Sequence, residues 1–199
     1  MPEPAPSPVI PGEVLLHICC GPCATWPVRQ LREAGSRPVG FWYNPNVHPY
    51  REYMLRLQSC RAMAAAVGLP LEVRDDYALR DYLTRVLPFG AGPERCSECY
   101  RIRLEATARK AQEIGLGAIS TTLLVSPYQQ HERLAAVARQ VAAECGLSFV
   151  YQDWRAGFRQ GRVESRALGL YHQGYCGCVF SEFERYAPGD KRPVREGRS

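Results

Sequence analysis

Seven of the nine cysteines fall in three short clusters, and thiols grouped in this way are typical of metal, iron–sulfur or redox chemistry. The clusters are Cys19-Cys20-Gly21-Pro22-Cys23, Cys96-Ser97-Glu98-Cys99 and Cys176-Gly177-Cys178. The odd number of cysteines, and a start with no secretory signal pattern, argue against a secreted disulfide scaffold. The other two, Cys60 and Cys145, lie on apolar faces of predicted helices, where we expect them to pack in the core.

Two thiols of the first cluster and the Cys96/Cys99 pair together supply four sulfur ligands, the number that a 4Fe-4S cluster or a structural zinc ion takes. Adjacent side chains of an extended segment point to opposite faces, so the turn at Gly21-Pro22 has to bring Cys19 and Cys20 to one centre. Zinc sites usually space their cysteines further apart, which favours the larger cluster. A four-cysteine zinc site, or a simple helix-capping role for the second cluster, stays open.

Cys176 and Cys178 are separated by a single glycine. A disulfide between them would close a tight, strained and easily reduced ring, so the pair is predicted to be redox-active, with metal ligation as the alternative. Cys23 is left without a partner. It either ligates a further metal or is a plain thiol in the turn.

Predicted strands alternate with predicted helices along the whole chain, a pattern that favours an α/β fold with a parallel sheet of about five strands and helices on both faces. The strands are expected at residues 14–18, 38–43, 71–73, 118–125 and 147–151. The helices are expected at 24–35, 50–67, 77–87, 95–114, 130–145 and about 163–168. Neither a Gly-rich dinucleotide fingerprint nor a Walker-type phosphate loop follows the first strand.

Polar side chains follow the second, fourth and fifth predicted strands. The carboxyl ends of parallel strands meet at one edge of a sheet, so we expect these groups near the cysteine turn that follows the first strand. The candidate substrate-binding residues are Tyr43, Asn44, Asn46, Thr121, Thr122, Ser126 and Arg155. Turn formation is the alternative for each of them. Arg101 and Arg103 follow Cys99 and either bind phosphates or form a solvated helix face.

The composition is that of one globular domain: 199 residues, 46% apolar and 23% charged, with no apolar run long enough to cross a membrane. We expect a flexible Pro-rich leader at residues 1–12, the folded domain at 13–187 and a disordered basic tail at 188–199. The net charge of +5 fits a polyanionic partner such as RNA, although an arginine-rich composition also follows from a GC-rich genome.

Six segments together resemble the cobalamin-independent epoxyqueuosine reductases, and they extend from about Leu15 to Glu182. They are LLHICCGPC (15–23), FWYNPNVHPYREY (41–53), RCSECYRIRL (95–104), STTLLVSPYQQHE (120–132), DWRAGFRQG (153–161) and GLYHQGYCGCVFSE (169–182). The resemblance implies a single HUP-like (Rossmann-like) domain. It also implies the last step of queuosine synthesis, in which epoxyqueuosine at the wobble position of the tRNA anticodon is reduced to queuosine.

The same resemblance implies a 4Fe-4S cluster bound by Cys19, Cys20, Cys96 and Cys99, and a redox-active pair at Cys176 and Cys178. It also implies an adjacent mononuclear iron, for which position alone suggests Cys23. Epoxide deoxygenation takes two electrons and two protons. We hypothesise that His17, His48, Tyr128 or His131 supplies the protons. An external electron donor, a cytoplasmic location without membrane attachment and a monomeric state are further expectations.

The sequence leaves two alternative functions open. A tRNA-thiolating iron–sulfur enzyme of similar fold would carry a Ser-Gly-Gly-x-Asp phosphate loop after the first strand, where this chain has Cys-Cys-Gly-Pro-Cys. A non-catalytic, zinc-stapled RNA-binding module would be colourless and would hold one zinc ion.

Overall fold

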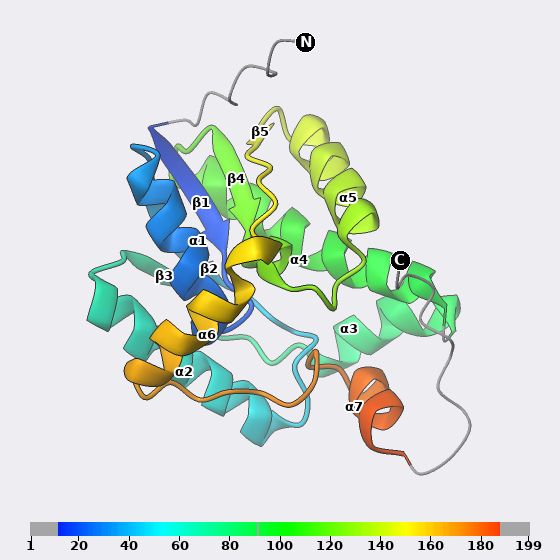
Figure 1. Ribbon diagram of the computed structural model, residues 1–199. Helices are drawn as coiled ribbons and strands as arrows, with labels where there is room; N and C mark the ends of the chain where they lie inside the picture. The colour runs from blue at the N-terminus through cyan, green and yellow to red at the C-terminus, as the bar shows by residue number, and fades with distance from the viewer. Residues whose placement is uncertain (1–11, 91, 188–199) are drawn as a thin grey trace, which may run out of the picture.

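A computed structural model describes residues 12–90 and 92–187; the expected basic tail and all but Gly12 of the expected leader lie outside them. Five parallel strands form one sheet in the order β3-β2-β1-β4-β5 (Figure 1). The strands are β1 (Glu13–His17), β2 (Arg37–Trp42), β3 (Leu71–Val73), β4 (Ala118–Thr121) and β5 (Ser148–Phe149). The predicted α/β class and the parallel sheet are confirmed.

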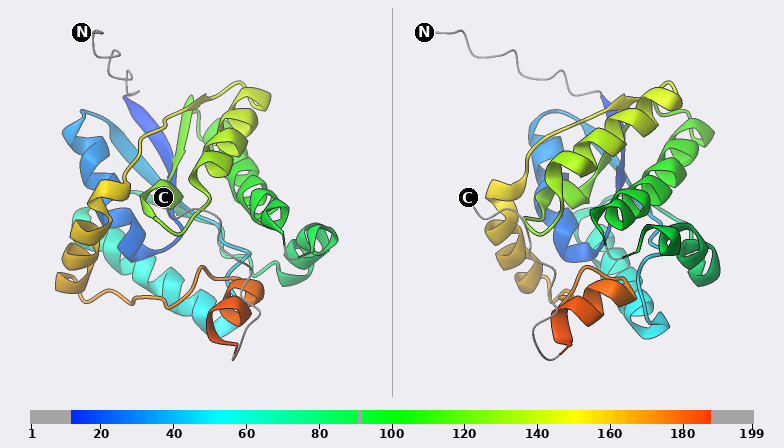
Figure 2. Two further views of the ribbon diagram at one scale, coloured as in Figure 1. Left: turned by 45° about the vertical axis from the view of Figure 1, so that its right-hand side comes forward. Right: turned by 90° about the vertical axis from the view of Figure 1, so that its right-hand side faces the viewer.

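The connecting helices cover both faces of the sheet. They are α1 (Gly21–Glu33), α2 (Tyr50–Val67), α3 (Leu79–Val86), α4 (Pro93–Glu113), α5 (His131–Glu144), α6 (Phe158–Ala167) and α7 (Val179–Tyr186). Helices α2 and α6 pack on α1, whereas α4 packs on α5 across the sheet (Figure 2). Apolar side chains of β1 fill the interior between these two layers of helices. Val14, Leu15 and Leu16 are fully buried, as expected for a central parallel strand that is covered on both faces. In the part of the chain that the structure describes, no helix is both long and apolar enough to cross a membrane.

Three differences from the predicted elements matter for the site. Helix α1 begins at Gly21 rather than Ala24, because Pro22 is well suited to a first helical turn. The predicted strand 118–125 is wrong in its second half: Thr121 accepts a hydrogen bond from the Leu123 amide, and a 3-10 turn, η2 (Thr122–Val125), follows. Helix α6 begins at Phe158, before the expected residue 163.

Helix α7 follows Cys178 and was not predicted. Cys178 caps it, since its Sγ accepts a hydrogen bond from the Ser181 amide at 3.4 Å. The segment between α6 and α7 crosses the carboxyl edge of the sheet, so that both helices lie on the same side of the molecule as the ends of β1 and β4 (Figure 1).

Candidate functional site

The first cysteine cluster forms a compact group of thiols at the carboxyl end of β1. The Sγ atoms of Cys19, Cys20 and Cys23 lie within 4.8 Å of one another, and those of Cys19 and Cys20 are 3.9 Å apart. Sulfurs around one tetrahedral metal ion are about 3.8 Å apart when each metal–sulfur bond is about 2.3 Å. The three thiols can therefore bind a metal, and Cys23 belongs to the group rather than lying apart from it.

Hydrogen bonds from outside the turn hold this group in place. Thr122 Oγ1 accepts a hydrogen bond from the Cys19 amide at 3.1 Å and lies 3.3 Å from Cys19 Sγ. Gln173 Nε2 donates to Cys20 Sγ at 2.9 Å. The thiols of Cys20 and Cys23 hold the pKa of Cys19 well below its usual range, so Cys19 is the member of the group that loses its proton most readily.

The second and third cysteine clusters lie beside one another, on α4 and in the loop before α7. Burial, together with the neighbouring thiols of Cys99, Cys176 and Cys178, raises the pKa of Cys96 to about 12. Cys96 and Cys99 are not part of the compact group of three described above. All nine cysteines are free thiols, Cys176 and Cys178 included.

Arg103 lies close to members of all three cysteine clusters: Cys19, Cys99 and Cys176. Its side chain is 1% exposed, and its Nη2 donates to Cys99 Sγ at 3.3 Å. No carboxylate of the described residues lies within ion-pair distance of it. Burial opposes its charge, but Cys99 and Cys176 raise its pKa on balance. The alternatives considered for Arg103, a phosphate contact or a solvated face, are both wrong, because the side chain does not reach the surface. Arg101 is partly exposed and is paired with Glu144 at 3.0 Å.

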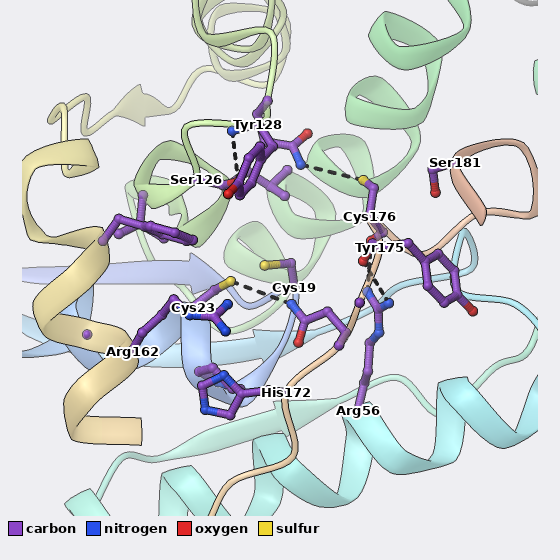
Figure 3. Close-up of a pocket in the computed structure, with 18 of the residues that line it drawn as sticks. Cys19, Cys23, Arg56, Ser126, Tyr128, Arg162, His172, Tyr175, Cys176 and Ser181 are labelled. Carbon is purple, nitrogen blue, oxygen red and sulfur yellow. Dashed lines mark hydrogen bonds between the residues drawn. The ribbon is translucent and has the colours of Figure 1, made fainter. Parts of the chain in front are cut away.

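A cavity of about 550 Å³ opens over the cysteines (Figure 3). Cys19, Cys23 and Cys176 line it, together with the aromatic rings of Trp26, Tyr128 and Phe158. A volume of this size suits a single small-molecule or nucleoside ligand. The cavity is bounded by α1, η2, α6 and the segment that leads to α7.

The segment before α7 is anchored to α2 by a buried ion pair. Arg56 Nε donates to Glu52 Oε1 at 2.7 Å, and its two terminal nitrogens donate to the backbone carbonyls of Tyr175 and Cys176. Tyr171 donates to the other carboxylate oxygen of Glu52 at 2.6 Å. These contacts fix the wall of the cavity that carries Cys176.

The histidines proposed as proton donors do not line this cavity. His17 is fully buried, with its ring nitrogens at Thr121 Oγ1 (2.9 Å) and the Tyr43 carbonyl (3.3 Å), and burial lowers its pKa to about 4. His48 packs against the Tyr77 and Tyr82 rings. His131 lies 3.0 Å from the Tyr151 hydroxyl. Of the four proposed donors, only Tyr128 reaches the cavity.

The predicted substrate-binding residues fall into two groups: some lie at the cavity or its cysteines, and the others do not. Ser126 lines the cavity, and Thr122 positions Cys19. Four others support the backbone or the packing: Asn44 donates to the Ile18 carbonyl at 2.8 Å, Thr121 caps η2, Tyr43 lies under Arg74, and Asn46 is buried. Arg155 is bound to Asp153 at 2.6 Å and does not line the cavity.

Sequence reasoning missed His172 and Gln173, which both line the cavity. His172 Nε2 lies 3.1 Å from Ser165 Oγ, and its Nδ1 has no hydrogen-bond partner. Burial, together with Arg162 and Arg166, lowers its pKa. The two residues lie three and four positions before Cys176, and this closeness in the chain to the third cysteine cluster is the signal that could have pointed to them.

Comparison with known proteins gives one consistent answer. The family model described as "Epoxyqueuosine reductase QueH" matches residues 14–184. A protein of that name from Dehalococcoides mccartyi is 36% identical over 174 residues, which cover 87% of this chain and 94% of the relative. One from Thermotoga maritima is 34% identical, with 87% and 92% covered. One from Helicobacter pylori is 36% identical and longer, since the match covers 54% of it.

Proposed function

Since the chain belongs to the epoxyqueuosine reductase QueH family, we propose that it reduces epoxyqueuosine to queuosine in the anticodon of tRNA. The observation that carries the proposal is the cavity at the carboxyl edge of the sheet, which is lined both by thiols and by aromatic rings. The reaction consumes two electrons and two protons. It breaks both C–O bonds of the epoxide, leaves a cyclopentene and releases water.

The residues present fit a sulfur-ligated iron cofactor. A guanidinium buried without a carboxylate partner is costly unless an anion lies beside it. The groups that raise the pKa of Arg103 are thiols, with Cys99 and Cys176 first, and the Tyr82 hydroxyl. Cysteine thiolates bound to iron would supply that anion. We propose a 4Fe-4S cluster on Cys19, Cys20, Cys96 and Cys99, with an adjacent iron for which Cys23 is the candidate ligand. Such a cluster, when bound, transfers electrons one at a time.

The chain's own residues then bind the substrate and position its groups. Trp26, Tyr128 and Phe158 present ring faces and edges on which a purine-like base can stack. Ser126 and Gln129 offer polar groups at the same wall, and Gln129 Nε2 lies 3.5 Å from Cys176 Sγ. Tyr128 and His172, which both line the cavity, are the proton donors that we propose.

Cys176 and Cys178 have different surroundings. Cys176 is exposed at the cavity wall, whereas Cys178 is buried at the start of α7. We propose that they act as a two-electron dithiol/disulfide couple between an external donor and the cofactor. A monomeric reductase domain at residues 13–187, working on tRNA in the cytoplasm, completes the proposal.

The test is anaerobic purification, iron and sulfide analysis, and assay on tRNA that contains epoxyqueuosine. We expect a brown protein with about four to five irons and about four sulfides, which converts the substrate to queuosine. A colourless protein with one zinc and no turnover would overturn the proposal and favour the RNA-binding module. Thiolated tRNA as the product would favour the thiolating enzyme.

A further inference from the structure

We propose that Arg162 and Arg166 of α6, with Arg185 of α7, bind the phosphates on either side of the nucleoside that enters the cavity. We call these three residues the arginine rim. The inference rests on the proposed function, because it assigns the surface on which the RNA of that reaction lies.

The size of the cavity implies that most of the RNA lies outside it, on the protein surface. A volume of about 550 Å³ accommodates one nucleoside but not an anticodon loop. Enzymes that act on a base take that nucleotide out of the stack and into a pocket, so the flanking backbone stays outside. The backbone must therefore follow the protein surface around the mouth of the cavity.

Positive charge gathers at that mouth without neutralising partners. Arg162 and Arg185 line the cavity, and Arg166 lies one helical turn beyond Arg162. Among the described residues, none of the three guanidinium groups has a carboxylate oxygen within 4.0 Å. By contrast, the nearby Arg29 is held by Glu164 at 2.6 Å. The rim charges are thus available to phosphates.

The positions of Arg162 and Arg166 are supported by a second observation. Both arginines lower the pKa of His172, a residue that itself lines the cavity, so both charges lie close to the opening. Figure 3 shows Arg162 and His172 on one side of Cys23, with Tyr128 on the opposite side of the cavity.

Aromatic rings lie beside the arginine rim. The guanidinium of Arg162 lies 5.8 Å from the Phe158 ring centroid, and Phe158 meets Tyr128 edge to face at 5.9 Å. Tyr128 is 69% exposed, so its ring is accessible to a base. Arginines interleaved with accessible rings are typical of surfaces that bind single-stranded nucleic acid.

The test compares two double variants of the full-length, anaerobically prepared protein. Arg162→Ala/Arg166→Ala removes two rim charges. Arg109→Ala/Arg139→Ala removes two exposed arginines of α4 and α5, on the other face of the sheet, and Arg139 lies over the Tyr151 ring much as Arg162 lies over Phe158. The net charge changes equally in both. The probe is a fluorescent anticodon stem-loop with guanosine at the wobble position, and anisotropy is measured across a salt series.

We expect the rim variant to bind about tenfold more weakly, with a salt slope reduced by about two, while the control binds as the parent does. Equal affinities and equal slopes in the two variants would overturn the inference. The result is independent of turnover: a protein that fails to reduce epoxyqueuosine but shows the rim effect contradicts only the proposed function. One that reduces it normally with both variants unaffected contradicts only the rim.

Discussion

The guanidinium of Arg103 donates to the sulfur of Cys99 at 3.3 Å and has no carboxylate within ion-pair distance among the described residues. A second bond, from Arg103 Nε to the Cys99 carbonyl at 3.0 Å, fixes the side chain along α4. A cation held in this way, in the interior, favours an anionic partner at the sulfurs. It also favours the more negative oxidation state of any cluster that they bind.

Arg103→Met should therefore lower the midpoint potential of the proposed cluster. A charge at about 6 Å in a medium of effective dielectric near 20 corresponds to a shift on the order of 100 mV. Arg103→Lys keeps the charge and should recover most of the shift. The measurement is an EPR-monitored redox titration, with iron content as the check on loading. Identical potentials in the parent and both variants would show that the charge does not act on the cluster.

A substitution series, read out as iron and sulfide content, distinguishes which cysteines act as the proposed ligands. Alanine at Cys20 or Cys99 should remove most of the cluster, whereas Cys23→Ala should lose about one iron and retain the sulfide. Cys60→Ala is the matched control, because Cys60 is buried on α2 outside the cysteine clusters. Loss of the whole cluster from Cys23→Ala, with full loading of Cys99→Ala, would instead assign the compact group Cys19/Cys20/Cys23 as the main ligands.

Proton delivery should depend on Tyr128 and His172, the two proposed donors that line the cavity. Tyr128→Phe and His172→Gln are expected to slow single-turnover deoxygenation by about tenfold or more, since general acid catalysis contributes about 10²–10⁴-fold. His131→Gln should not, because His131 lies behind Tyr151. Rapid-quench assays with prereduced enzyme isolate this step. Unchanged rates for both cavity variants would assign the protons to solvent.

The α/β class, the parallel sheet and the edge of the sheet at which the first cysteine cluster lies followed from the sequence, because alternating apolar strands and helices allow few arrangements. The order of the strands within the sheet did not. The cysteine clusters were recognisable because thiols at those spacings have few other uses. Side-chain direction was not predictable. His17 ends β1, and both Arg155 and Ser126 lie beyond the ends of strands, yet of these three only Ser126 lines the cavity. Gln173 and the anchoring pair Glu52–Arg56 depend on contacts between segments more than 100 residues apart, which local patterns do not encode.

The buried neutral His48 makes stability depend on pH. Burial lowers its pKa from about 6.5 to about 4, so the unfolded chain binds a proton that the folded chain excludes between these values. The contribution of His48 to the free energy of unfolding is therefore complete above pH about 6.5. It falls by at most about 3 kcal/mol as the pH is lowered towards 4. Urea unfolding of the parent and of His48→Asn at several pH values measures it. A slope unchanged by the substitution would refute the assignment to His48.

Gly21 ties the cysteine turn to α2. A β-carbon at this position would lie 2.5 Å from the backbone oxygen of Ser59, a contact that no side-chain rotation relieves. Gly21→Ala should therefore push the start of α1 away from α2, lower the free energy of unfolding by about 2–4 kcal/mol and displace Cys20. Gly117→Ala is the control, since a β-carbon there meets nothing within 4 Å. Chemical denaturation and iron content report the two effects. A Gly21→Ala protein as stable and as well loaded as the Gly117→Ala protein would mean that α1 and α2 do not hold the turn as closely as their packing indicates.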